Sequence, residues 1–300
     1  MSIVIPEGIE DIYRRIIDKC VKLIDLKYWD GVEKENLLTW VKKFKTDEEM
    51  FLASAILNTL IYRSKNAVES FGANIFQIIL PQVLSNEKIY EITSLDEWES
   101  TLKHKSCLQL PFKFSTIEGV DGAPAKSGSV IYRALQRKYF HKSIGVDSLN
   151  IKNVDKNIKA IILFDDMLGT SEQFTSFVEK YELNKLPLKI IYIPLAAHQD
   201  GMDLVKNKYN NIVIHPVEIL DQRNSFFASE NRFLHGKNTS SIEEIEKFYR
   251  KFCIANKIKI KDIIGHGDMA LTYCFYDSTP NNNLALLWYS SNTWPELFTR

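Results

Sequence analysis

The stretch from Ile161 to Thr175, IILFDDMLGTSEQFT, constrains the fold of this chain more than any other. Its four leading apolar residues predict a strand that is buried on both faces, as strands of parallel sheets are. Two adjacent carboxylates, Asp165 and Asp166, follow this run. They are therefore expected at the carboxyl end of the strand, where open α/β sheets bind ligands.

A short polar turn leads from the carboxylates into a helix that we predict over residues 172 to 182. Thr170 is the predicted N-cap, and Gln173 would complete a capping box. The N–H groups at such a helix start suit a phosphate. A phosphate cradle beside two carboxylates suits a phosphorylated ribose, because its vicinal hydroxyls donate to carboxylates. The plainer alternative is an ordinary strand-turn-helix with two solvated aspartates.

Composition excludes several classes of protein. The 300 residues are 45% hydrophobic and 25% charged, which is ordinary for a globular protein. A formal net charge of zero offers no electrostatic case for binding nucleic acid or a membrane surface. The N-terminus lacks the build of a signal peptide, and no apolar run approaches the roughly 20 residues of a membrane helix. Four scattered cysteines indicate buried thiols in a reducing compartment, so we expect a cytoplasmic protein.

Residues 1 to 105 are predicted to form a helical region. Apolar residues between positions 9 and 24 recur with the three-four spacing of an amphipathic helix. Further helices are expected at residues 37–44, at 47–64, and from 71 to a break at the proline of position 81. No polar constellation in this region suggests chemistry, so we interpret it as a helical support or a partner surface.

From residue 106 onward, strands alternate with helices. Strands are predicted at 107–115, 161–164, 188–196 and 211–220. This alternation predicts an α/β fold, with a parallel sheet covered by helices on both faces and preceded by the helical region. Right-handed crossovers would bring the loops that follow the first three strands to one edge. In the tail we expect a helix over 241–255 and two strand-like runs, ALTYCFYD and LALLWYSS.

The stretch that holds the two carboxylates resembles the ribose-phosphate-binding motif of the phosphoribosyltransferases. That motif is an apolar strand, two acidic residues, two apolar residues and a small-residue Thr/Gly loop. The resemblance implies that Asp165 and Asp166 form the catalytic pair that faces the ribose hydroxyls. It also implies a 5′-phosphate loop made of Gly169, Thr170, Ser171, Glu172 and Gln173. Ser171 departs from the motif, which usually has Gly there, and Glu172 replaces a small residue.

The same resemblance gives meaning to two weaker patterns. The loop between the first strand of such a sheet and its helix contacts the pyrophosphate of the donor, and here it holds Lys126, Ser127, Gly128 and Ser129. Lys126 would supply charge, and the Ser-Gly turn would allow a close approach. His198 follows the third strand, where the base or acceptor pocket lies, although a lone His at such a place is more often structural.

Nearly the whole chain is similar to phosphoribosyltransferase-like effector proteins of bacterial conflict systems. The similarity includes the helical front with Trp40 and Phe44, the Ser127-Gly128 loop, and the tail TPNNNLALLWYSSNTWPELFTR. Such proteins occur in anti-phage modules, some of which carry a reverse transcriptase and a non-coding RNA. The resemblance therefore implies protein partners from a defence module, which hold a toxic activity in check.

The sequence thus predicts a phosphoribosyltransferase-like domain over residues 106–300 behind a helical region over 1–105. It predicts an anti-phage effector that binds phosphoribosyl diphosphate or a nucleotide, with Mg²⁺ held through the ligand's phosphates. Two hypotheses stay open: an enzyme acting at the sugar C1, or a non-catalytic nucleotide-sensing module that controls assembly with defence partners. The departures at Ser171 and Glu172, and the lack of an evident general base, favour the second.

Overall fold

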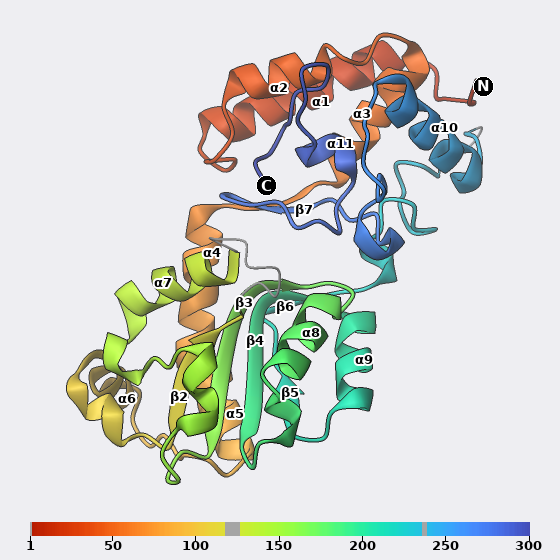
Figure 1. Cartoon of the computed structure of the whole chain (residues 1–300). Coiled ribbons are helices and arrows are strands. Elements are labelled where there is room, and N and C mark those ends of the chain that lie inside the picture. Colours follow the sequence, from red (N-terminus) through yellow and green to blue (C-terminus); the bar gives the residue numbers. More distant parts are fainter. Residues whose placement is uncertain (1, 118–126, 236–238) are drawn as a thin grey trace. The chain divides into compact units, whose positions relative to one another are not determined.

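The computed structural model describes residues 2–117, 127–235 and 239–300 (Figure 1). The chain forms two compact units. The first, which we call the terminal unit, combines Met1–Ala67 with Asp221–Arg300, and the second, the central unit, is Val68–Leu220. The predicted division near residue 106 lies inside the central unit, because the helices just before it pack on the same sheet.

The terminal unit is mainly helical. Its helices are α1 (Ile9–Asp25), α2 (Lys34–Val41), α3 (Asp47–Thr59), α10 (Ile242–Ala255) and α11 (Ala285–Trp288), with 3₁₀ turns at Gln222–Asn224 and His266–Asp268. Two short strands, β1 (Ile61–Arg63) and β7 (Tyr273–Phe275), pair in parallel. Segments that lie far apart along the chain therefore share one small sheet.

Two predictions for the terminal unit are wrong. The helix expected to reach residue 64 ends at Thr59, because the next residues pair with β7. The run LALLWYSS contains the short helix α11 in place of a strand. Ala285, Leu286 and Leu287 are all fully buried, and periodicity cannot distinguish a short buried helix from a buried strand.

Aromatic side chains form the centre of the terminal unit's core. The Trp40 ring packs against Phe44 and Trp294, with centroid distances of 4.6 and 6.4 Å. The indole N–H of Trp40 donates to the carbonyl of Leu286 at 2.7 Å. Residues from both ends of the chain thus complete one core.

The central unit is built on a parallel five-stranded sheet, as predicted. The order is β2-β3-β4-β5, and β6 also pairs with β4. The strands are β2 (Phe112–Thr116), β3 (Ala160–Leu168), β4 (Lys189–His198), β5 (Ile212–Ile214) and β6 (Glu218–Leu220). The single strand predicted over 211–220 is divided in two, because Pro216 between the two parts has no N–H to donate to β4.

Helices cover both faces of this sheet (Figure 1). On one face, α8 (Glu172–Lys180) and α9 (Gln199–Lys208) bury side chains against β3 and β4. The other face carries aromatic contacts among Phe76, Phe114 and Phe164. The remaining helices of the unit are α4 (Lys65–Asn74), α5 (Leu80–Asn86), α6 (Leu95–Lys103) and α7 (Ser127–Tyr139), with 3₁₀ turns at Lys105–Gln109, Lys142–Ile144, Ser148–Asn153 and Leu183–Lys185.

The helical run Lys65–Asn86 continues through Pro81, where we predicted a break. A π-helical turn over Ile75–Ile79 precedes the proline, and this wider turn accommodates a residue that cannot donate to the carbonyl four residues back. Contrary to the sequence expectation, the run is long and apolar enough to cross a membrane, and it is the one such helix among the described residues. Phe76 within it is buried against the sheet, which is an ordinary role for an apolar helix.

Candidate functional site

Strand β3 lies inside the sheet, as predicted, and carries the acidic pair in its last part. Pairing with β2 stops at Phe164, whereas pairing with β4 continues to Leu168. Asp165 and Asp166 therefore lie just beyond the end of β2, within the strand and not after it. This position is on the carboxyl-end edge of the sheet, where parallel sheets bind ligands.

The Asp165 side chain is engaged inside the fold. It is 3% exposed, and its Oδ2 accepts a hydrogen bond from the Tyr192 hydroxyl at 3.0 Å, while Oδ1 accepts one from the Asp166 N–H at 3.0 Å. Burial raises the pKa of the Asp165 carboxyl well above its usual value, and the neighbouring Asp166 carboxylate raises it further. The predicted contact of Asp165 with the ribose hydroxyls stays a prediction.

Tyr192 is a residue of this site that the sequence reasoning missed. Its fully buried ring stacks on Phe174 of α8, with centroids 4.2 Å apart. Burial and the two carboxylates raise the pKa of the Tyr192 hydroxyl, which therefore remains a donor to Asp165. In the sequence, the signal for Tyr192 is a single hydroxyl-bearing side chain inside the otherwise apolar run that forms β4. Through Tyr192, the acidic pair is connected to the helix that follows the predicted phosphate loop.

The start of α7 approaches the same carboxylate. A Cβ atom built on Gly128 would lie 2.7 Å from Asp165 Oδ1 and 3.1 Å from Thr116 Oγ1. Glycine therefore lets the backbone come close to Asp165, whereas the predicted close approach of the Ser127-Gly128 turn to a pyrophosphate stays a prediction. The segment from Ser127 belongs to the first turn of α7 and is not a loop.

The other two residues of that predicted segment have different outcomes. Ser129 lies in the first turn of α7, and its carbonyl accepts a hydrogen bond from Arg133 Nε at 3.3 Å. Lys126 lies outside the described residues, so its predicted contact with an anion stays a prediction.

The predicted phosphate loop turns on a left-handed residue. Helix α8 begins at Glu172, and Ser171 is its N-cap with φ of 70° and no side-chain capping bond. The predicted cap at Thr170, with Gln173 as its capping-box partner, is therefore wrong, since the helix starts one residue later. The resembled motif has Gly at the position of Ser171, and Gly adopts this backbone conformation most easily. The sequence departs from the motif here while the chain keeps the left-handed turn.

Helix α9 closes against the same loop. A Cβ atom on Gly201 would lie 2.0 Å from the carbonyl oxygen of Gly169, so only glycine fits. His198, at the end of β4, is 4% exposed, and its Nδ1 accepts a hydrogen bond from the Asp200 N–H at 3.3 Å. His198 is thus the N-cap of α9, a structural role that accounts for it without a ligand.

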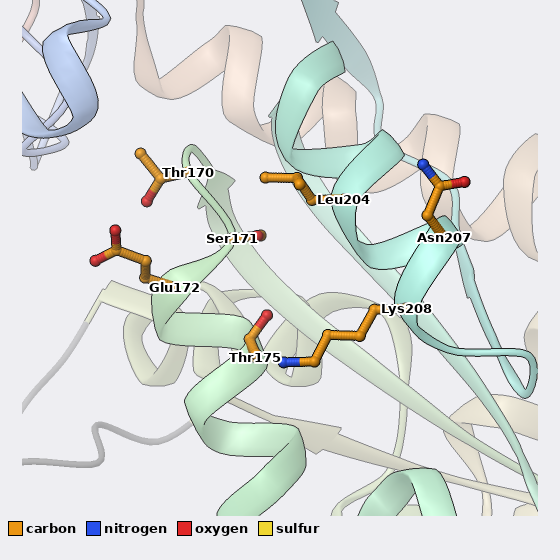
Figure 2. Close-up of a pocket in the computed structure, with 7 residues that line it drawn as sticks. All are labelled: Thr170, Ser171, Glu172, Thr175, Leu204, Asn207 and Lys208. Carbon is orange, nitrogen blue, oxygen red and sulfur yellow. The ribbon is translucent and has the colours of Figure 1, made fainter.

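A pocket of about 480 Å³ opens between α8 and α9 (Figure 2). Its walls come from the loop and α8 (Thr170, Ser171, Glu172 and Thr175) and from α9 (Leu204, Asn207 and Lys208). Three residues of the predicted phosphate loop therefore border it, but Asp165 and Asp166 do not. Figure 2 shows the Thr170 and Glu172 side chains directed away from α9.

The described residues contain no group of three or more His, Cys, Asp or Glu side chains that could hold a metal ion. One or two carboxylates beside a phosphate ligand are nevertheless the usual setting for Mg²⁺, which keeps several waters and binds through the ligand's oxygens. The donor set at the end of β3 fits this second arrangement.

Comparison with known proteins yields a family match over most of the chain. The model of the family described as PRTase-CE matches residues 37–300. No curated protein matches the sequence. Among solved structures, the Helicobacter pylori xanthine-guanine-hypoxanthine phosphoribosyltransferase is similar, with 10% identity and a TM-score of 0.28, over 57% of this chain and 95% of that one.

Proposed function

Because the chain belongs to the PRTase-CE family, a phosphoribosyltransferase-like group, we propose that it binds a phosphorylated ribose at the carboxyl end of β3. One observation carries the proposal. Asp166 ends a buried acidic pair on an interior parallel strand, and a left-handed turn at Ser171 and the start of α8 follow the end of that strand. Gly128 brings a second helix start against the same pair. A ribose with a phosphate on either side would match these three parts.

The roles of the parts follow from their chemistry. The Asp166 carboxylate would accept hydrogen bonds from the ribose hydroxyls, beside the Asp165 carboxyl that bonds to Tyr192. The N–H groups of the Gly169–Gln173 loop would hold the 5′-phosphate, at the positive end of the α8 dipole. The first turn of α7 would face a pyrophosphate or β-phosphate. Mg²⁺ would bridge the ligand's phosphate oxygens.

The enzymatic form of the proposal is a transfer or cleavage at the sugar C1. The bond from C1 to its leaving group breaks, and the leaving group departs with the electron pair. Positive charge then develops at C1 and is stabilised by a fixed carboxylate such as Asp166. An acceptor or water forms the new bond at C1.

The second candidate is a non-catalytic module that senses a nucleotide and controls assembly with defence partners. Two observations favour it. The Asp165 carboxyl is used within the fold, and Glu172 brings an acidic side chain to the first turn of α8. An extra carboxylate beside a bound phosphate repels the phosphate and weakens its binding. Weaker binding suits a nucleotide sensor better than an enzyme with rapid turnover.

The cellular part of the proposal is an anti-phage effector in the cytoplasm, held in check by partner proteins. The enzyme hypothesis and the sensor hypothesis predict different effects on metabolite pools. Expression of the wild type without partners should arrest growth and deplete a nucleotide-type pool if the protein is an enzyme. Identical metabolite pools in wild-type and Asp166→Asn strains, with arrest only in the wild type, would remove the enzymatic form.

The identity of the ligand is the first thing to measure. The purified full-length protein should retain a phosphorylated ribose compound, detected by mass spectrometry after denaturation. The Asp166→Asn variant, purified in parallel, should retain less of it. Retention of the same compound in equal amount by both proteins would count against the site.

A further inference from the structure

Charge is distributed unevenly along this chain, although the formal net charge of the whole is zero. The segment from residue 101 to residue 160 holds eleven Lys and Arg residues against four Asp and Glu residues. Of these four acidic residues, Asp147 and Asp155 are among the described ones, and both are exposed. A strong excess of one sign in one part of a chain indicates a partner of the opposite sign.

The fold brings several of these basic residues together at the β2 edge of the central sheet (Figure 1). The 3₁₀ turn Lys105–Gln109 leads into the amino end of β2. The segment after α7 lies beside it, because the His141 N–H donates to the carbonyl of Leu102 at 2.7 Å. We call this surface the basic edge, and its basic residues are Lys103, His104, Lys105, Arg137, Lys138, His141 and Lys142.

Ordinary structural roles account for some of these charges. Lys103 Nζ lies 3.5 Å from a carboxylate oxygen of Glu99, and Lys138 Nζ lies 3.1 Å from one of Glu69, so both lysines have an ion-pair partner. Arg137 lies in the last turn of α7, where a cation stabilises the negative end of the helix dipole. These residues alone would therefore not indicate a partner.

Lys105 and Lys142 have no such structural role. Both are exposed, and none of the ion pairs within the described part of the chain includes either of them. Each is the first residue of a 3₁₀ turn, which is the end of a turn where the dipole does not favour a cation. Their charges are thus available to the anions of a partner.

The surroundings of these charges suit an extended polyanion better than an acidic protein. Protein interfaces have an apolar centre that carries most of the binding energy. Among the described residues of the basic segment, the exposed large apolar side chains are Leu108, Val130 and Leu149, and they lie on three different elements. The phosphate backbone of a nucleic acid needs no apolar centre, because Lys and Arg contacts dominate its binding.

We propose that the basic edge binds the phosphate backbone of a nucleic acid through Lys105, Arg137 and Lys142. The contacts would go to phosphates and not to bases, so binding would depend strongly on salt and little on sequence. The basic edge lies toward the amino end of β2, whereas the acidic pair lies at the carboxyl-end edge of the sheet. The inference is therefore independent of the ribose site proposed above.

The test uses the full chain and four fluorescently labelled probes: an RNA and a DNA oligonucleotide, each single-stranded and as a duplex. Anisotropy titrations should show saturable binding to at least one probe, with an affinity that falls as salt is added. The double change Lys105→Gln/Lys142→Gln should weaken this binding at least about tenfold. It should also reduce the slope of log affinity against log salt by about two, one for each lost phosphate contact.

The matched control is Lys34→Gln/Lys206→Gln. It removes the same charge from the chain at two exposed lysines outside the basic segment. Its affinity should stay within about twofold of the wild type, because charges farther away than a Debye length are screened. All four lysines are exposed, so both double variants should fold as the wild type does, which far-UV circular dichroism checks.

Three results would overturn the proposal. The first is the absence of saturable binding to any of the four probes at low salt. The second is an equal loss of affinity in the two double variants, which would assign the binding to the net charge of the chain and not to the basic edge. The third is equally tight binding of a poly-glutamate peptide, which would assign the surface to an acidic protein.

Discussion

The two compact units bury different kinds of polar side chain. Among the described residues, the buried polar ones of the terminal unit are neutral: Ser54, Thr272, Thr279, Asn282 and Asn283. The central unit also buries Asp165, Asp166 and His198, all near the carboxyl ends of β3 and β4. A buried charge costs more than a buried amide, and perturbed carboxyls gather at functional sites. The comparison therefore supports the proposal that the ligand binds to the central unit.

The buried amides of the terminal unit explain the polar run in the tail. Asn283 accepts a hydrogen bond from the Tyr273 N–H and donates one to the carbonyl of Pro280 at 2.8 Å. Asn282 donates to the carbonyl of His266 at 2.9 Å. These bonds hold the turn that follows β7. The side chains of Asn282 and Asn283 therefore stabilise this turn.

The largest expected effect is on the terminal unit's core. Trp40→Ala should lower the free energy of unfolding by about 3–5 kcal/mol, because it leaves a cavity and removes the hydrogen bond from the Trp40 indole to the Leu286 carbonyl. Denaturant unfolding followed by circular dichroism measures this loss. If the comparison is right, affinity for phosphoribosyl diphosphate stays unchanged while the variant is folded. A large loss of affinity in folded Trp40→Ala would break the comparison.

A pair of glycines sharpens the contrast between the units. Gly201→Ala places a Cβ 2.0 Å from the Gly169 carbonyl oxygen, and Gly31→Ala places one 2.0 Å from that of Tyr276. Each should cost about 1–3 kcal/mol of stability, because backbone must move. Only Gly201→Ala should also weaken ligand binding, since it displaces the phosphate loop. Equal effects on binding, measured by calorimetry, would contradict this division of roles.

The pH dependence of stability should distinguish a buried carboxyl from a buried hydroxyl. The pKa of Asp165 is raised in the folded protein above the ordinary 3.8. Folding therefore favours its protonated form, and stability falls as the pH rises from that value toward the raised pKa. Asp165→Asn removes this dependence, so its stability relative to wild type should increase between pH 5 and pH 8.

The matched control for this prediction lies in the terminal unit. Thr272→Val removes a hydroxyl that donates to the Thr59 carbonyl at 3.0 Å, and its cost should be the same at both pH values. Urea unfolding at the two pH values measures both variants. If the difference in unfolding free energy between Asp165→Asn and wild type is the same at both pH values, burial does not raise the pKa of the Asp165 carboxyl.

The smallest expected effect concerns left-handed residues. Ser171→Gly relieves a backbone φ of 70°, and Lys257→Gly relieves one of 59° in the terminal unit. Each should gain about 1 kcal/mol of stability, read from thermal unfolding. Neither change should weaken the binding of phosphoribosyl diphosphate, because the backbone N–H groups of the loop, and not the Ser171 side chain, would hold the phosphate. A loss of binding in Ser171→Gly alone would contradict this role of the backbone.

Local sequence patterns predicted the elements that are marked by an apolar run or by an amphipathic, capped stretch. The apolar run before Asp165 fixed an interior strand, and the capped amphipathic helix α10 begins one residue after the predicted start. Ser171 shows the limit of such signals, since the capping pattern misplaced the helix start by one residue. Left-handed conformations are uncommon at non-glycine residues, so no local pattern predicted one at Ser171.

Long-range pairing explains the other misses. β1 pairs with β7 across most of the chain, so the terminal unit is assembled from both ends and no composition shift marks its boundary. The acidic pair lies within β3, and not after it, because β4 continues the pairing to Leu168. Tyr192 bonds to Asp165 across neighbouring strands, a contact that only the register of the sheet could reveal.

The most direct test of the central claim is calorimetry with phosphoribosyl diphosphate and Mg²⁺. Wild type should bind, and Asp166→Asn should bind at least about tenfold more weakly, since under the proposal its carboxylate would accept hydrogen bonds from the ribose hydroxyls. Asp203→Asn is the control, because Asp203 accepts a hydrogen bond from Gln199 within α9 and does not belong to the proposed ribose site. Its affinity should equal that of the wild type. Unchanged affinity in folded Asp166→Asn would contradict the account.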